Sequence, residues 1–472
     1  MNERMNKRTS ELAQILKAAF ENLRKSKVDY CVLRNYEDLP EYTTHDVDIL
    51  VTESDFKHAV ATVKQTAIEC GWGVLAEVRQ YKCHSLYFYY DKTNSVQFIA
   101  FDFVTDLPWG WLPTVNIQHV FASKIWFRGI PVASPGADAA MRLIKVLIRR
   151  QPITDKAAKH IMKGALAGPN DFKTTFAGIL SKSLVESWFD CIKSERIGRL
   201  SEYSLRVRHS VFRHALGRAP VRSLIGAIKY FLSRIRRYWR GSLGAFVVLV
   251  GPDGAGKTTL ALKLSEGIGT LVFRGTALYH SQFNFLPRLR TLGRRITGLK
   301  LKEIDFTQPH SGSKVKPTGM ARCILYLLYY IWDYQLGRLS LWLHRGRSRL
   351  ILFDRYFYNY YYQKAYMRLP WLFLDFLRIA VPKPDVVLIM DADASVIYDR
   401  KPELDCPEIE RQLEAINKLT ERLHSIVLKR VQASQGLEVA ENEAVRAIVG
   451  FVAAKNRKGS LAEIHNNRII NH

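Results

Sequence analysis

The chain has 472 residues, more than one hydrophobic core of ordinary size takes up, so we expect about two or three domains. Hydrophobic residues make up 47% of it, which supports globular folding, and the formal net charge of +26 favours a polyanionic partner or substrate. The six cysteines lie far apart with no C-x-x-C pair, which argues against a disulfide framework and against a zinc site.

The beginning of the chain is polar and leads into an amphipathic helical pattern, without the apolar core of a signal peptide. The longest apolar run, Cys323–Trp332, falls short of the roughly 20 residues that span a bilayer. Together with the cysteine usage, these features lead us to expect a cytoplasmic protein. A peripheral position on the inner face of the membrane stays open.

Carboxylates interrupt two predicted strands near the start of the chain. Asp46 and Asp48 alternate with Val47 and Ile49, so the two carboxylates point the same way and repel each other unless a cation holds them. Asp102 interrupts a second apolar strand, where a buried carboxylate is costly unless it is paired or bound to metal. The three are candidate Mg²⁺ ligands. The alternative is a solvated acidic pair, with Asp102 in a salt bridge.

This pattern resembles the minimal nucleotidyltransferase superfamily, in which a motif after one strand is followed by D-x-D on the next and by a distal acidic residue. The resemblance covers roughly residues 28–150 and implies an α+β nucleotidyltransferase-like domain over residues 1–150. The family usually carries Gly-Ser, which cradles the incoming triphosphate, where this chain has Arg34-Asn35. Nucleotidyl transfer by this domain therefore stays open.

Residues 151–242 are predicted to form a basic helical connector without strands, rich in arginine and poor in acid in its second half. Within it, Val221–Ile235 carries an apolar stripe and a cationic face. Such a helix can lie on an anionic membrane surface, or it can dock on a neighbouring domain with its arginines in water, which we favour. Nucleic-acid contact is possible but not favoured, because no reading motif accompanies the charge.

The strongest signal is G-x-x-x-x-G-K-[ST] at Gly251–Thr258, between the apolar run Ala245–Val250 and a predicted helix. The amides of such a turn wrap a phosphate at the positive end of the helix. Lys257 is expected to reach the β- and γ-phosphates of ATP, and Thr258 to ligate Mg²⁺. The predicted nucleotide-binding residues are Gly251, Asp253, Gly254, Ala255, Gly256, Lys257, Thr258 and Thr259.

Further functional candidates follow predicted strands. Asp354 and Arg355 follow the strand Leu350–Phe353, at the edge where doubly wound sheets bind ligands. Asp354 is expected to hold the hydrated Mg²⁺, and Arg355 to grip the phosphate of the acceptor. We also predict a strand over Gly269–Arg274, ending in Arg274, and a mobile cationic segment in which Arg400 closes over the transferring phosphoryl group.

Two longer stretches complete the second half. Phe283–Arg322 is a basic insertion that either binds an anionic acceptor or forms a solvated loop. Pro407–Lys429 is predicted to be one long helix. We place the phosphate-loop domain at residues 243–457 and a flexible tail at 458–472.

The set GPDGAGKTT, FDRYFYN and PDVVLIMDAD, followed by YDRKPEL, resembles the thymidylate kinase family of nucleoside monophosphate kinases over about residues 243–455. The resemblance implies a doubly wound parallel sheet with ATP at Gly251–Thr258 and Mg²⁺ near Thr258 and Asp354. It also implies that Arg355 holds the acceptor phosphate and that Arg400 lies in a lid. Family members pair through helices, so a homodimer is a possible assembly.

The acceptor side departs from the family pattern. Arg274-Gly275-Thr276 stands where an Arg-Glu-Pro run is usual, and Asn359 stands close to where a Ser is often found. We take Arg274, Arg355 and Asn359 as the acceptor-binding residues and dTMP as the first acceptor to consider. One alternative is a kinase acting on a sugar, glycan or lipid-linked acceptor in surface polysaccharide assembly. A second is a nucleic-acid end-processing or binding protein.

Overall fold

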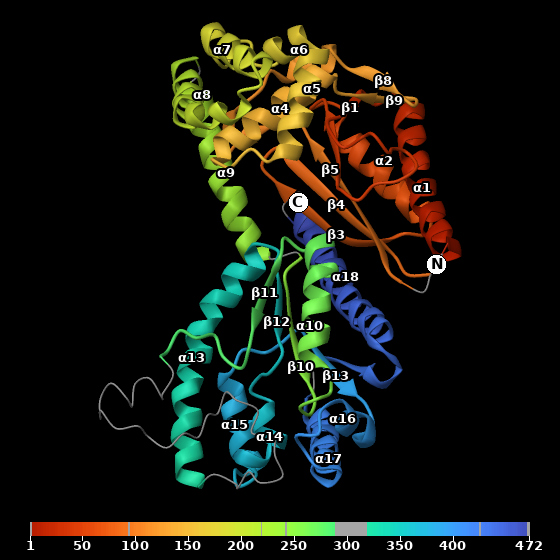
Figure 1. Cartoon of the computed structure of the whole chain (residues 1–472), viewed down its shortest axis with the longest axis vertical. Helices are drawn as coiled ribbons and strands as arrows, with labels where there is room; N and C mark the ends of the chain where they lie inside the picture. The colour runs from red at the N-terminus through yellow and green to blue at the C-terminus, as the bar shows by residue number, and fades with distance from the viewer. Residues whose placement is uncertain are drawn as a thin grey trace. The chain divides into compact units, whose positions relative to one another are not determined.

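The computed structural model describes residues 2–92, 95–218, 220–240, 243–287, 319–423 and 426–469. The chain divides into two compact units, the first made of Met1–Tyr90 with Gln97–Arg237 and the second of Asp91–Val96 with Tyr238–His472 (Figure 1). Most of the expected connector thus belongs to the first unit. The greater part of the basic insertion, residues 288–318, lies outside the described residues.

The first unit is built on a seven-stranded mixed sheet in the order β3-β4-β5-β2-β1-β9-β8. Helices α1 and α2 cover one face of it, and α3 and α4 pack on the other. The strands of this unit are β1 (Tyr30–Val32), β2 (Val47–Val51), β3 (Gly73–Gln80), β4 (Cys83–Tyr90), β5 (Gln97–Val104), β8 (Ile125–Phe127) and β9 (Ile130–Val132), with a small hairpin of β6 (Pro108–Trp109) and β7 (Leu112–Pro113).

The expected connector is helical in its described part, and its first helices share a core with α4. Trp188 is fully buried there and packs edge to face with Phe176, which in turn packs edge to face with Phe172. The helices of this unit are α1 (Asn2–Lys25), α2 (Phe56–Glu69), α3 (Ile117–Ala122), α4 (Pro135–Arg149), α5 (Asp155–Ala167), α6 (Pro169–Thr174), α7 (Lys182–Lys193), α8 (Ser204–Arg218) and α9 (Pro220–Arg240), with a 3-10 helix at Ile197–Tyr203.

The second unit has a five-stranded sheet, parallel throughout, in the order β11-β12-β10-β13-β14. Its strands are β10 (Ala245–Val250), β11 (Thr276–Tyr279), β12 (Leu350–Phe353), β13 (Val386–Asp391) and β14 (Val427–Gln432). Every residue of the central strand β10 is buried, as expected of a parallel strand covered on both faces. The predicted α/β architecture with a parallel sheet is confirmed for this unit.

Helices cover both faces of this sheet. Helices α13, α14, α15 and α17 share an aromatic core with one face, and α10 and α18 lie together on the other (Figure 1). They are α10 (Lys257–Glu266), α11 (Ile268–Leu271), α13 (Met320–Gly346), α14 (Asn359–Tyr362), α15 (Trp371–Ala380), α16 (Ala394–Arg400), α17 (Cys406–Arg422) and α18 (Leu437–Ile469), with 3-10 turns at Lys364–Tyr366 and Ala433–Gln435. No described helix is long and apolar enough to cross a membrane.

Two sequence predictions of secondary structure differ from the structure. The strand predicted over Gly269–Arg274 is wrong: this stretch contains helix α11, and the strand is β11, after Gly275 turns the chain with a φ of +98°. The helix predicted over Pro407–Lys429 ends at Arg422, because Val427–Gln432 pairs with β13 along its full length. Helix α18 continues to Ile469, into the segment expected as a tail.

A buried carboxylate fixes the chain after β11. Asp333 of α13 is 1% exposed, and it accepts hydrogen bonds from the backbone N–H groups of Phe283 (2.7 Å), Phe285 (2.7 Å) and Leu286 (3.0 Å). Because a buried ion needs several partners to offset its lost hydration, these donors and the carboxylate depend on one another. Residues 283–286 are therefore tied to the middle of α13.

We predict that Asp333→Ala lowers the unfolding free energy by about 3 kcal/mol, because three amides lose their acceptor in a protected site. Urea denaturation of the full chain, followed by circular dichroism, measures the change. Glu421→Ala, at an exposed position on α17, is the matched control and should leave stability nearly unchanged. Equal stability of the two variants would contradict the anchoring role.

Candidate active site

The phosphate-loop motif lies at the carboxyl end of β10, directly before α10. Gly254 and Gly256 have φ values of +94° and +90°, a conformation that L-residues with side chains rarely adopt. The loop borders a pocket of about 480 Å³. The residues that line it are Asp253, Gly254, Ala255, Gly256, Lys257, Thr258, Thr259, Leu260, Arg355, Met390, Arg400, Lys401, Ala433, Leu437 and Ala440. All the predicted nucleotide-binding residues except Gly251 are in this lining.

Lys257 is buried at the base of this pocket. Its ammonium donates to the carbonyls of Gly251 (2.8 Å) and Pro252 (2.7 Å) and lies 3.5 Å from a carboxylate oxygen of Asp253. Burial lowers the pKa of Lys257, and the nearby Asp253 opposes this shift. The loop thus holds a cation through its own carbonyl groups.

Thr258 joins the loop to the neighbouring strand β12. Its hydroxyl donates to Oδ2 of Asp354 at 3.0 Å, and Oδ1 of Asp354 lies 2.7 Å from Nδ1 of His280. Asp354 is buried, and it provides hard oxygen ligands together with Thr258, as Mg²⁺ prefers. The residues present therefore fit a magnesium ion. His280 follows β11 directly, and the misplaced strand is the reason it did not stand out in the sequence.

Asp253 lies between two cations. Arg355 donates to its Oδ1 at 2.7 Å, beside the ammonium of Lys257. Although burial favours the neutral acid, Lys257 and Arg355 hold the pKa of Asp253 below its usual value. The carboxylate is an internal counter-ion for two side chains that were predicted to bind phosphate. An incoming phosphate would compete with it for both.

The structure brings Arg400 to the same pocket, where it donates to the carbonyl of Ala433 at 2.8 Å. Asn359 is buried close to the loop. Its Oδ1 accepts from the hydroxyl of Tyr362 at 2.6 Å, and that hydroxyl also lies 3.1 Å from the carbonyl oxygen of Gly251. Asn359 is thus linked to the phosphate loop through one tyrosine.

Arg274 is not brought to this site, which corrects the expectation that it lines the acceptor pocket. It is exposed and precedes β11, so it lies at the amino end of that strand, whereas His280 and Asp354 follow the carboxyl ends of β11 and β12. Its backbone N–H donates to the carbonyl of Ser348. The error follows from the misplaced strand.

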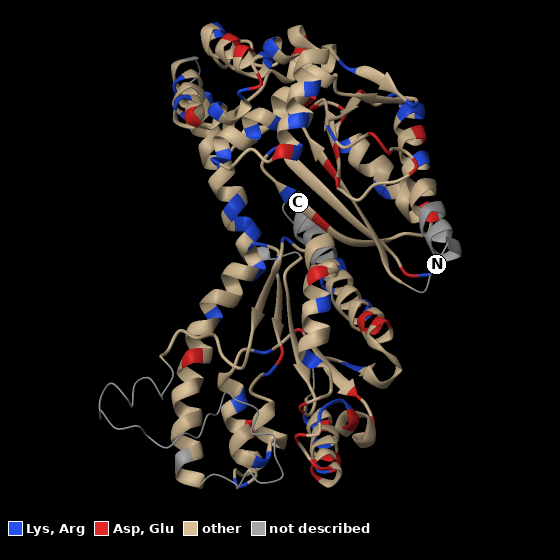
Figure 2. Ribbon diagram, viewed as in Figure 1, with Lys and Arg blue, Asp and Glu red and all other residues tan. Residues whose placement is uncertain are grey.

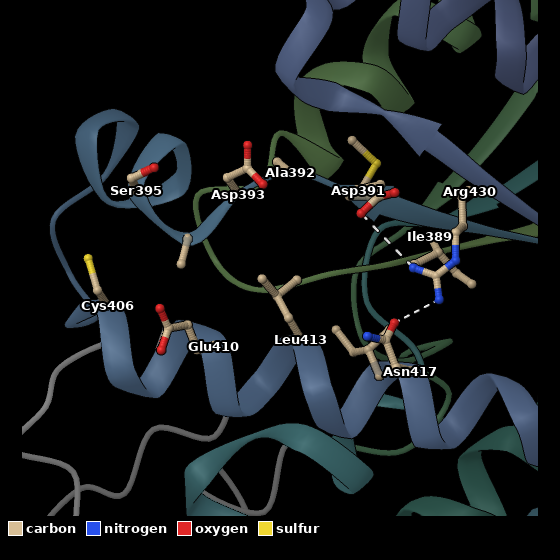
Figure 3. A pocket seen from close by; sticks show the side chains of 13 residues that line it. Ile389, Asp391, Ala392, Asp393, Ser395, Cys406, Glu410, Leu413, Asn417 and Arg430 are labelled. Atoms are coloured by element: carbon tan, nitrogen blue, oxygen red, sulfur yellow. Dashed lines mark hydrogen bonds and ion pairs between the residues drawn. The ribbon is translucent and has the colours of Figure 1, made fainter.

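A second pocket, of about 490 Å³, lies beyond the carboxyl end of β13 (Figure 3). Asp391, Asp393 and Glu410 line it, together with Arg430, which donates to Oδ1 of Asn417 at 2.7 Å and lies 4.0 Å from Asp391. Three carboxylates and one guanidinium make this pocket unsuited to a phosphate. The pocket at the phosphate loop is lined by Lys257, Arg355 and Arg400 and suits an anion better.

In the first unit, the three predicted metal ligands do not form a metal site. Asp46 is exposed and precedes β2, while Asp48 and Asp102 are partners in the parallel strands β2 and β5. Asp48 accepts two hydrogen bonds from Arg34, at 2.5 and 3.0 Å. Within the described ranges, no group of three or more His, Cys, Asp or Glu side chains is placed to hold a metal ion. A guanidinium neutralises the central carboxylate instead.

A second ion cluster lies on α4 of the same unit. The buried Asp138 accepts from Nε of Arg142 at 2.8 and 3.0 Å, and Nε2 of His160 lies 2.8 Å from it. Arg142 also donates to Oδ1 of Asn35 at 3.2 Å. Both residues that stand in place of the usual Gly-Ser therefore make hydrogen bonds within the unit, Arg34 to Asp48 and Asn35 to Arg142.

No known protein-family model matches the chain. A probable thymidylate kinase of Sulfurisphaera tokodaii is 25% identical over 214 residues, which is 44% of this chain and 97% of that protein. The crystal structure of thymidylate kinase from Ehrlichia chaffeensis matches 43% of this chain and 98% of its own at 15% identity, with a TM-score of 0.30. Neither of these proteins is named as a nucleotidyltransferase.

The cation-rich surroundings of α4 lead to a pH prediction. Burial lowers the pKa of Lys145 from 10.5 to about 8, and repulsion from Arg34, Arg149 and Arg142 acts in the same direction. The attraction of Asp48 opposes this shift. Between these two values the unfolded chain binds more protons than the folded one, so the stability of the first unit rises as the pH rises through this window.

Lys145→Met should therefore stabilise the first unit at pH 7 by about 1 kcal/mol, after allowance for solvent screening, and the gain should vanish near pH 10. Urea denaturation at a series of pH values measures it. Lys159→Met, at an exposed position on α5, is the control and should show no such dependence. A gain that persists unchanged to high pH would contradict the prediction.

Proposed function

We propose that the second unit is an ATP-dependent phosphotransferase that transfers the γ-phosphoryl group to a nucleoside monophosphate. The observation that carries the proposal is the 3.0 Å hydrogen bond from Thr258 to Asp354, in a pocket lined by Lys257. This bond joins the hydroxyl of the phosphate loop to a carboxylate that follows β12, the strand beside β10 in the sheet. The weak similarity to a probable thymidylate kinase supports the same class of reaction.

In this proposal the side chains bind and position charged groups, without a covalent intermediate. Lys257 exchanges its loop carbonyls for the β- and γ-phosphate oxygens of ATP. Thr258 and Asp354 would hold Mg²⁺, which would neutralise charge on the triphosphate when bound. Arg355 leaves Asp253 to hold the acceptor, and Arg400 covers the phosphoryl group. An acceptor oxygen forms the new bond to the γ-phosphorus as the bond to the ADP oxygen breaks.

For the acceptor we propose dTMP first, on the basis of the relative's printed name. The buried Asn359 lies near the phosphate loop and is the remaining acceptor-side candidate, because Arg274 lies at the other end of its strand. The alternative is a sugar, glycan or lipid-linked acceptor. A nucleic-acid end-processing activity is a further alternative, which rests on the +26 charge alone. We assign no nucleotidyl transfer to the first unit, because Arg34 occupies Asp48.

Lys257→Ala should reduce ATP turnover by roughly a thousandfold, because it removes the cation that meets the transferring phosphate. ADP release in the presence of acceptor is the measurement. Asp253 keeps its hydrogen bond from Arg355 in this variant, so we expect the fold to be retained, as circular dichroism can verify. Lys263→Ala, an exposed lysine on the same helix α10, is the matched control and should keep wild-type turnover. Normal turnover by the Lys257 variant would exclude this site as the catalytic centre.

Incubation with ATP, Mg²⁺ and a panel of nucleoside monophosphates identifies the acceptor. We expect a diphosphate product from dTMP above the other members, detected by anion-exchange chromatography. Turnover on a glycan or lipid-linked acceptor without a nucleotide product would replace dTMP by that acceptor while keeping the phosphotransferase. Absence of any Mg²⁺-dependent nucleotide binding would overturn the phosphotransferase itself.

A further inference from the structure

Helix α9 contacts the first unit through its less apolar side. Gly226 is buried against Tyr81 and Trp111, and a Cβ at Gly226 would lie 3.1 Å from the Tyr81 hydroxyl. One turn later the ring of Tyr230 lies 6.1 Å from that of Tyr81 and 6.0 Å from that of Trp111. Arg237 continues this side and donates to Gln80 at 3.2 Å. The spacing of Gly226, Tyr230 and Arg237 places them on one face of the helix.

The opposite face of α9 is aliphatic and exposed. Its side chains recur at helical spacing, and their exposed fractions lie between 47% and 69%. They are Val221, Leu224, Ile225, Ile228, Leu232 and Ile235. An amphipathic helix of a globular domain normally buries such a stripe, whereas this helix presents it to solvent. A contiguous exposed stripe of this kind is a feature of interaction surfaces.

Cations border the stripe along one edge. Arg222, Lys229 and Arg236 recur every seven residues and are all exposed. Figure 2 shows basic and no acidic positions along α9, in agreement with its sequence. Lys229 helps to lower the pKa of Glu53, which itself pairs with Lys82. The exposed edge of the stripe thus carries basic side chains that can contact anionic groups at a surface.

We propose that the exposed face of α9 binds the surface of an anionic lipid bilayer. Aliphatic side chains inserted below the headgroups, with arginine and lysine at headgroup level, satisfy both halves of the face. A nucleic acid would meet the cations but leave the aliphatic stripe in water. A second copy of this strongly basic chain would cover the stripe but bring like charges together. The proposal goes beyond the phosphotransferase activity and does not depend on it.

Vesicle flotation of the full chain tests this proposal. We expect binding to phosphatidylcholine vesicles that contain roughly one third phosphatidylglycerol, no binding to pure phosphatidylcholine, and weaker binding at higher salt. The triple variant R222Q/K229Q/R236Q should bind roughly a hundredfold more weakly. The control K156Q/K159Q/K163Q removes the same charge from exposed positions on α5 and should bind like the wild type.

A second variant, L224Q/I228Q/L232Q, keeps every charge and replaces aliphatic side chains by a good helix former. Its vesicle affinity should fall by at least about tenfold, with an unchanged circular dichroism spectrum. Absence of binding to the anionic vesicles, or an equal loss in the α5 control, would overturn the proposal. So would tighter binding to a short RNA than to vesicles, or an oligomer that dissociates in the aliphatic variant.

Discussion

The second unit depends on the parallel pairing of two buried strands. In the register of β10 and β12, Val248 is the partner of Phe353, so the phosphate loop and Asp354 follow closely at the same edge of the sheet. The hydrogen bond between Thr258 and Asp354 is a consequence of that register. A slip of one residue would turn Asp354 away from the loop. The register of these hydrophobic strands thereby determines where the phosphate loop and Asp354 lie relative to each other.

In each unit, one carboxylate pairs internally with cations at a predicted site. Asp253 lies between Lys257 and Arg355 in the second unit, and Asp48 takes both hydrogen bonds of the Arg34 fork in the first. The two cases differ in access. Asp253, Lys257 and Arg355 line an open pocket, where an incoming phosphate can compete with the carboxylate for the two cations. Asp48, by contrast, is buried within a sheet. A charged side chain can therefore bind a ligand only where the fold leaves it accessible from solvent.

The parts of the site that follow strongly patterned strands could be predicted from the sequence. Ala245–Val250 is apolar throughout, and its glycine-rich turn and lysine admit few other interpretations. The half-buried edge strand β11 carries no such pattern, so the sequence prediction places Arg274 wrongly and does not single out His280. The partner of Asp48 lies fourteen positions earlier in the chain, where only the fold reveals the ion pair. Pairing across a sheet is a non-local property, which composition and spacing do not encode.

The hydroxyl of Tyr362 touches the carbonyl of Gly251 and the amide of Asn359 at once. Any molecule that reorients this amide must also disturb the first residue of the phosphate loop. The position of the Asn359 side chain is thereby coupled to the backbone of the phosphate loop through a single phenol. If the proposed phosphotransferase uses Asn359 for its acceptor, the acceptor side and the ATP side of the pocket share this one tyrosine as a common support.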